Sequence, residues 1–149
     1  MQVSFYLLNE NKAQDILGFV CQLTQKVLKQ SAKPLVILST DTPRLQQLDE
    51  ALWSLDASSF IPHHLWTDAP IAAIPSDTRA APAAYLCTAL PLNYDGVVLN
   101  LDDAPIHSDG GHVTRVLELI APDEHSVQIG RDKYKHYQQR GATLEHFRL

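Results

Sequence analysis

The stretch KPLVILSTDTPRLQQLDEAL, residues 33–52, combines the two patterns that decide the fold. Its apolar run Leu35–Leu38 is continuous, which is typical of a strand covered on both faces. In Asp41-Thr-Pro43, either of the first two side chains can cap a helix, and the proline fits the first helical turn. That helix has one apolar stripe, made by Leu45, Leu48 and Leu52. A buried strand followed by an amphipathic helix predicts a parallel α/β unit.

The same order of strand and helix precedes this stretch. Val3–Leu8 is a short apolar run that ends at Asn9, and a helical period begins at Asn11. The inward stripe of that helix is Ile16, Val20, Leu23 and Val27. Two such units in succession predict an α/β fold with a mostly parallel sheet, right-handed crossovers and flanking helices.

The rest of the chain continues the pattern less regularly. Residues 56–83 contain several prolines, so we expect loops there, with one short strand near 71–74. The further elements that we expect are strands over 84–88 and 96–101, a helix over 112–120, and a last helix that starts at Pro122 and stops before Gly141.

Length and composition favour one domain, residues 1–149. With 149 residues, 45% of them apolar, the chain can bury one ordinary core. The apolar runs are too short to cross a bilayer, and the start MQVSFYLL lacks the basic residues and cleavage site of a signal peptide. Cys21 and Cys87 lie far apart and suit buried, reduced thiols. We expect a cytoplasmic protein with no membrane contact.

Positive charge gathers near the end of an otherwise acidic chain of net charge -5. Residues 1–130 hold seven Lys/Arg against fifteen Asp/Glu, whereas residues 131–149 hold five against two. A long duplex-binding surface needs more basic residues along one face. The patch therefore suits a compact anionic partner such as an acidic peptide.

The segment RDKYKHYQQRG, residues 131–141, carries that charge on a predicted helix. Arg131 and Lys135 share one helical face, and Tyr134 lies on the border of the apolar face, where Gly130 lets the backbone approach the sheet. Cations beside a tyrosine can hold a carboxylate while the ring packs against an apolar side chain. A solvated basic helix end, favoured by the helix dipole, explains the same charges without a binding site.

An aromatic pair lies in the middle of the chain. Trp53 falls at the edge of the leucine stripe, and Phe60 precedes Pro62 in a polar segment. Exposed together, the two rings make a patch of the kind that anchors protein interfaces. The alternative is that both rings cover the rim of the core.

Catalytic, metal and cofactor signatures are missing from the sequence. The first strand-to-helix junction, LLNENKAQD, lacks the glycines of a phosphate loop, and the seven histidines show no metal-ligand spacing. Asp102 and Asp103 follow an apolar strand, as magnesium-binding acids do in phosphate-loop ATPases, but turn and cap roles explain them as well. We assign no catalytic residue, no metal and no cofactor.

Three segments carry a resemblance to a known family: FYLL near the N-terminus, LDEALWS with SFIPHHL in the middle, and RDKYKHYQQRG near the C-terminus. Together they resemble the chi subunit of bacterial DNA polymerase III, an accessory protein of the clamp loader. The resemblance covers most of the chain and has its least support over residues 66–110. It implies a non-enzymatic replisome adaptor whose fold is like a nucleotide-binding domain without the phosphate loop.

In that family, one surface binds the psi subunit and another binds the acidic C-terminal tail of single-stranded DNA-binding protein. The resemblance implies that Trp53 and Phe60 serve the psi side, which in some relatives serves a helicase. The same likeness places Arg131, Tyr134 and Lys135 in the tail pocket, with Ile120 as its aliphatic wall. The family pattern RERYK reads RDKYK here, with the sign of each charge kept.

Two other functions fit parts of the sequence. A degenerate nucleotide-binding enzyme would use Asp102 and Asp103, and a direct nucleic-acid-binding protein would use the basic C-terminal helix. Magnesium-dependent ATP binding would indicate the first, and a steep salt dependence with bare oligonucleotide would indicate the second. The adaptor implies no direct contact with nucleic acid.

Overall fold

Strands and helices alternate along the chain in the computed structural model, which describes residues 1–30, 33–54, 61–67, 74, 83–107 and 113–149. Within these residues the strands are β1 (Gln2–Leu7), β2 (Leu35–Leu38), β3 (His63–Trp66), β4 (Ala84–Cys87), β5 (Val97–Asn100), β6 (Arg115–Ile120) and β7 (Thr143–Arg148). The helices are α1 (Glu10–Gln14), α2 (Ile16–Gln30), α3 (Thr42–Ser54) and α4 (Glu124–Gln139). Among the described residues, no helix has the length and apolar character needed to cross a bilayer.

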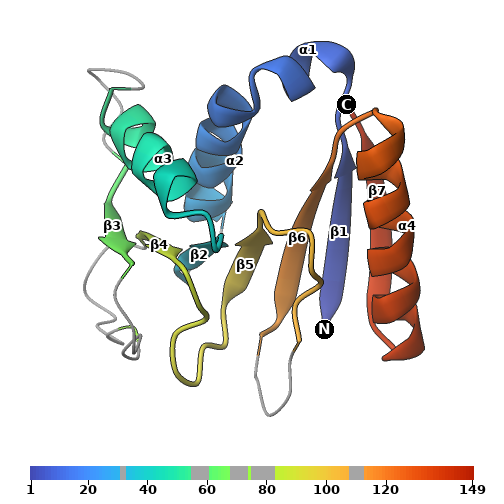
Figure 1. Cartoon of the computed structure of the whole chain (residues 1–149). Helices are drawn as coiled ribbons and strands as arrows, with labels where there is room; N and C mark the ends of the chain where they lie inside the picture. The colour runs from blue at the N-terminus through green and yellow to red at the C-terminus, as the bar shows by residue number, and fades with distance from the viewer. Residues whose placement is uncertain (31–32, 55–60, 68–73, 75–82, 108–112) are drawn as a thin grey trace.

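The strands form one seven-stranded sheet in the order β3-β4-β2-β5-β6-β1-β7 (Figure 1). Every pairing in the sheet is parallel. The predicted α/β class, with a parallel sheet flanked by helices in a single domain, is therefore confirmed. Strands β3 and β7 lie at opposite edges of the sheet, whereas β1, the first strand of the chain, lies inside it.

Helices cover both faces of the sheet, and the alternation of side chains along each strand shows which helix covers which face. Leu35 and Ile37 of β2 belong to the core shared with α2 and α3, whereas Val36 between them belongs to the core shared with α4. The leucine stripe of α3 is buried as predicted. The stripe of α2 is buried except for Ile16 in its first turn, which is 43% exposed.

The prediction of a helix over 112–120 is wrong, because residues 115–120 form β6. Val113, Val116 and Leu117 follow a helical spacing by chance, and both Val116 and Leu117 are fully buried because β6 lies between β5 and β1 with both faces covered. Such a short apolar run does not separate the two kinds of element. Strands β3 and β7 were not predicted, and residues 71–73 of the strand expected near 71–74 lie outside the described residues.

The connections place a crevice at one end of the sheet. From β1 the chain crosses over α2 to β2 on one side, and from the neighbouring β6 it crosses over α4 to β7 on the other side. In open α/β sheets, ligands bind outside the carboxyl ends of strands where the chain diverges in this way. The site described next lies at the carboxyl ends of β6, β1 and β7.

Candidate functional site: a basic and aromatic cavity between α4 and the sheet

A cavity of about 800 Å³ opens between α4 and the ends of three strands. Ile120, Leu7 and Arg148 are the last residues of β6, β1 and β7, and parallel pairing places them side by side in one row. All three line the cavity. The wall opposite them is the face of α4 that carries Val127, Gly130, Arg131, Tyr134 and Lys135.

The local sequence explains why α4 begins and ends where it does. Asp123 caps its first turn and accepts a hydrogen bond from Ser126 N at 2.9 Å. Ser126 Oγ donates a second hydrogen bond to the Asp123 carboxylate at 2.8 Å, and the two bonds lower the pKa of this carboxyl. At the other end, Gly141 has a φ of 78°, a left-handed conformation that favours glycine and turns the chain into β7.

Gly130 allows α4 to pack directly on β6, as the sequence predicted. A Cβ atom at this position would lie 2.5 Å from Ile120 Cδ1, closer than such atoms approach. The contact brings the helix backbone onto the side chain that forms the aliphatic wall of the cavity. Gly130 therefore sets how far Ile120 projects beneath Arg131 and Tyr134.

Three aromatic rings pack against one another along the side of the cavity. Tyr134 on α4 lies 5.3 Å from His146 on β7 and 5.8 Å from Phe5 on β1, measured between ring centroids. His146 also stacks on Phe5 at 5.8 Å. Tyr134 is half-buried, so one side of its ring packs against the protein and the rest borders the cavity.

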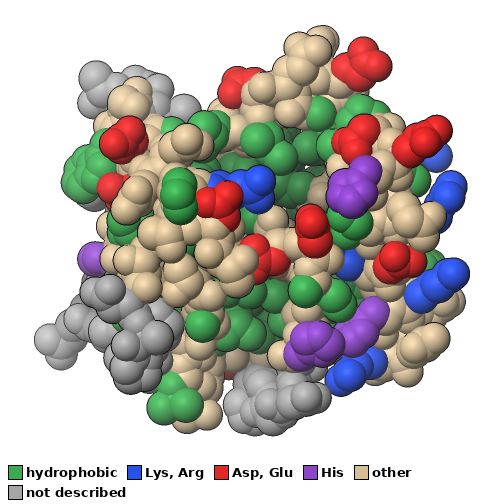
Figure 2. All heavy atoms as spheres, viewed as in Figure 1, with side chains coloured by type: hydrophobic (Ala, Val, Ile, Leu, Met, Phe, Trp, Pro, Cys, Tyr) green, Lys and Arg blue, Asp and Glu red, His purple; other side chains and the backbone are tan. Residues whose placement is uncertain are grey.

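The charged side chains that border the cavity within the described part of the chain are basic: Arg131, Lys135 and Arg148. All three are exposed. No hydrogen bond or ion pair of these three side chains is found among the described residues. Figure 2 shows Lys and Arg side chains gathered along the edge of the molecule that α4 occupies in Figure 1. Cations that lack a carboxylate partner beside an apolar cavity suit an acidic ligand with an apolar group.

The structure places around this cavity Arg131, Tyr134 and Lys135, which helical spacing grouped, and Ile120, which the family resemblance added. Sequence reasoning missed His146 and Arg148, which β7 contributes. The alternation of Leu144, His146 and Arg148 is the signal that places both on one face of a strand. Strand β7 itself was not predicted, so the alternation could not be used to place His146 and Arg148.

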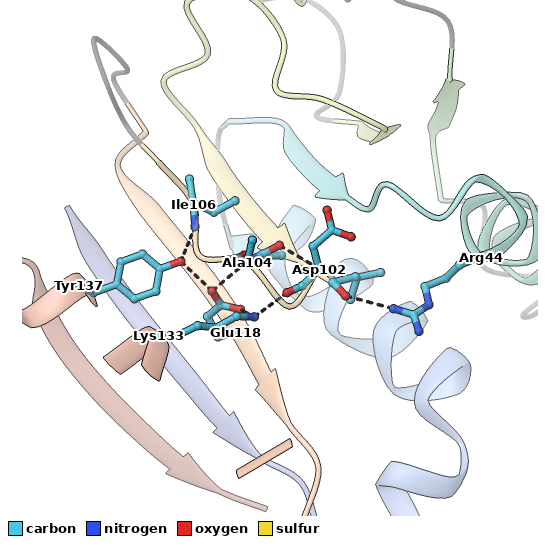
Figure 3. Close-up of polar contacts among 9 residues, drawn as sticks. Arg44, Asp102, Ala104, Ile106, Glu118, Lys133 and Tyr137 are labelled. Atoms are coloured by element: carbon cyan, nitrogen blue, oxygen red, sulfur yellow. Dashed lines mark hydrogen bonds and ion pairs between the residues drawn. The ribbon is translucent and has the colours of Figure 1, made fainter. Parts of the chain in front are cut away.

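A buried polar cluster lies next to the cavity, under the middle of α4 (Figure 3). Lys133 Nζ donates to Glu118 Oε1 at 2.8 Å and to the carbonyl oxygen of Asp102 at 2.6 Å. Glu118 is fully buried and Lys133 is 6% exposed. The basic residue between Arg131 and Lys135 thus points into the protein and ties α4 to β6.

The second oxygen of the Glu118 carboxylate is also occupied. Tyr137 Oη donates to Glu118 Oε2 at 2.7 Å and accepts from Ile106 N at 2.8 Å, and Asn100 Nδ2 donates to the same oxygen at 3.0 Å. Burial raises the pKa of Glu118, against the Lys133 ammonium and the two neutral donors, which lower it. Burial and the nearby carboxylate raise the pKa of Tyr137.

The second predicted surface lies at the far end of α3. Trp53 is 62% exposed, which agrees with the expected position at the edge of the stripe. The indole meets the ring of His63 edge to face at 4.9 Å, and His63 Nε2 lies 3.2 Å from Asp49 Oδ1. Phe60 lies outside the described residues, so the predicted pairing of the two rings stays a prediction.

The two acids that follow β5 have different surroundings. The Asp102 carboxylate accepts hydrogen bonds from Thr40 N at 2.9 Å and from Thr40 Oγ1 at 3.2 Å, and so joins the ends of β5 and β2. Asp103 is exposed. Among the described residues, no group of three or more His, Cys, Asp or Glu side chains could hold a metal ion. Cys21 and Cys87 are buried free thiols, and burial raises the pKa of Cys87 to about 12.

Comparison with known proteins supplies the family. Residues 1–145 match the family model described as DNA polymerase III chi subunit, HolC. The chain is 28% identical to the DNA polymerase III subunit chi of Pseudomonas aeruginosa, over 99% of this chain and 96% of that protein. It is 26% identical to the protein of the same name from Escherichia coli, over 95% and 93% of the two chains. The chain is 23% identical to the Haemophilus influenzae protein of that name, over 94% of this chain and 92% of that protein.

Proposed function

The chain belongs to the DNA polymerase III chi-subunit family, and from this premise we propose that it is a non-catalytic adaptor of the replisome. Chi subunits are accessory subunits of the polymerase holoenzyme in DNA replication. In the proposal, this chain links the clamp loader, through psi, to the acidic C-terminal tail of single-stranded DNA-binding protein. No chemical step is required of it.

The observation that carries the proposal is the cavity bordered by Arg131 and Lys135 with no carboxylate partner among the described residues. The two cations hold carboxylates of the tail, including the terminal one. Ile120 and Tyr134 receive the last side chain of the tail. A small apolar cavity with exposed ion pairs gives a Kd on the order of micromolar, about -8 kcal/mol, and the affinity falls as salt screens the charges.

The geometry of the sheet supports two simultaneous partners. Trp53 packs on β3 at one edge of the sheet, whereas the cavity lies beside β7 at the other edge. Seven strands spaced about 4.8 Å apart separate these edges by roughly 30 Å. Psi, or a helicase in its place, can therefore bind around Trp53 and Phe60 while the tail occupies the cavity.

Calorimetry with single-stranded DNA-binding protein tests the tail proposal. We expect binding by the intact protein and none after its last few residues are removed. Arg131→Glu should abolish binding, whereas Lys26→Glu on the exposed surface of α2 makes the same charge change away from the cavity and should bind as the wild type does. Tail affinity that survives Arg131→Glu in a folded variant would refute the proposal.

A further inference from the structure

The cavity extends beyond the four residues to which the proposed function gives a role. On the sheet side, its last row runs Ile120, Leu7 and Arg148 across β6, β1 and β7. Ile120 borders the part under Gly130, and Arg148 borders the part beside the outer strand β7. The end of the row at Arg148 is thus basic, and it lies on β7, outside the segment of α4 that carries Arg131, Tyr134 and Lys135.

The side chain of Arg148 is directed to the α4 side of the sheet by the alternation of β7. Leu144 packs in the core on that side, and His146 stacks on Tyr134. Arg148 is the next residue of the same parity and lines the cavity. It is exposed, and no hydrogen bond or ion pair of its side chain is found among the described residues.

The spacing along the row matches an extended peptide. Neighbouring strands lie about 4.8 Å apart, so the Cα atoms of Ile120 and Arg148 are separated by roughly 10 Å. An extended chain advances about 3.3 Å per residue, so this separation corresponds to roughly three residues. If the last side chain of a peptide lies against Ile120 and Tyr134, residues a few positions before it reach Arg148.

We propose that Arg148 is a further binding residue that contacts the acidic side chains preceding the terminal residue of the tail. The roles follow from the positions of the residues. Arg131 and Lys135 flank Tyr134 on α4 and hold the terminal carboxylate. Arg148 binds the acidic side chains that precede the last residue of the tail. The inference rests on the proposed function of the same cavity. It adds that the tail crosses from α4 to β7 and is recognised at both ends.

Two synthetic peptides and two substitutions of Arg148 test this contact. The first peptide has a run of aspartates followed by apolar residues and a C-terminal phenylalanine; the second has asparagines in place of the aspartates and keeps the terminal carboxylate. For the first peptide, Arg148→Ala should weaken binding roughly two- to fivefold, the effect of one exposed ion pair, and Arg148→Glu should weaken it further. For the asparagine peptide, Arg148→Ala should bind as the wild type does.

The controls separate this inference from the function on which it rests. Lys26→Ala removes one positive charge from α2, outside the cavity, and should leave both affinities unchanged. Arg131→Glu should weaken binding of both peptides. If Arg148→Ala binds the acidic peptide as tightly as the wild type, or weakens both peptides equally, the inference is wrong while the proposed function stands. If the wild type binds neither peptide, both are wrong.

Discussion

Lys133 Nζ lies 2.8 Å from Glu118 Oε1, so the middle cation of RDKYK is buried while Arg131 and Lys135 on either side of it border the cavity. The buried pair fixes the rotation of α4 about its own axis, because Lys133 must face β6. That rotation turns Tyr134 to the sheet and leaves the two outer cations at the rim. The helix thus has one buried structural cation, Lys133, and two exposed cations, which the proposed function assigns to tail binding.

Loss of Lys133 should therefore destabilise the fold strongly. Lys133→Ala leaves the Glu118 carboxylate buried without its cation, and we expect a loss of about 3–5 kcal/mol in the free energy of unfolding. Urea denaturation measures it. The double variant Lys133→Met with Glu118→Gln removes both charges and keeps an acceptor for Tyr137, so it should recover most of the loss. Equal stability of Lys133→Ala and the wild type would show that the pair does not hold α4.

Gly130→Ala should change tail binding more than stability. The new methyl group meets Ile120 Cδ1, the movable end of the side chain that lines the cavity, so Ile120 must shift and the apolar wall of the cavity changes shape. Alanine gains up to about 1 kcal/mol of helix propensity, which offsets part of the steric cost. We expect an unfolding midpoint near that of the wild type and tail affinity lowered several-fold in calorimetry.

Gly141→Ala is the matched control for that variant. It has open space around it but a φ of 78°, so alanine there strains the backbone without entering the cavity. It should lower stability by about 1 kcal/mol and leave the affinity of the folded protein unchanged. The reverse pattern in the two variants would contradict the role given to Gly130.

Asp123 should make stability depend on acid pH. Its folded pKa is lowered by hydrogen bonds from Ser126, so its contribution is complete above the unfolded pKa of about 3.9 and is lost as the pH falls through the lower folded value. Asp123→Asn keeps a capping side chain and should lose this pH dependence, whereas Asp123→Ala should be less stable than the wild type at neutral pH. Thermal unfolding at a series of pH values measures both. Identical pH profiles for the wild type and Asp123→Asn would refute the assignment.

Trp53→Ala should affect partner binding and hardly affect the fold. The ring is 62% exposed and meets His63 edge to face, so its removal should cost no more than about 1 kcal/mol of stability. Capture of psi should be lost while tail affinity is retained. Leu92, 64% exposed in the segment between β4 and β5, offers an alanine variant of another exposed apolar side chain that should capture psi normally. Normal capture of psi by Trp53→Ala would place the psi surface elsewhere.

The sequence predicted most of the elements whose apolar pattern is long or continuous. The helix periods behind Leu45 and Val20 are examples, as is the strand Leu35–Leu38. Prediction from the sequence failed over 115–120, where a short apolar run fits both the helical and the strand period. It also failed for β7, an edge strand that is mostly polar. In both cases the neighbours of the strand decide its structure, and those neighbours are distant in sequence.

The site shows the same division. Arg131, Tyr134 and Lys135 lie within five residues of one another, so helical geometry alone groups them. The meeting of Tyr134 with Phe5 and His146, and the burial of Lys133 against Glu118, depend on how β1, β6 and β7 pair. No local pattern encodes those pairings.

Strand β1 pairs with two partners from the far end of the chain: Gln2 lies opposite Arg115 on one side and Thr143 on the other. During translation, β1 leaves the ribosome long before β6 and β7, so it lacks both neighbours until they too have been made. Contacts so distant in sequence slow folding, because a long loop must close before they form. The peptide cavity, which is lined by residues of β1, β6, α4 and β7, therefore assembles only after synthesis has passed β7.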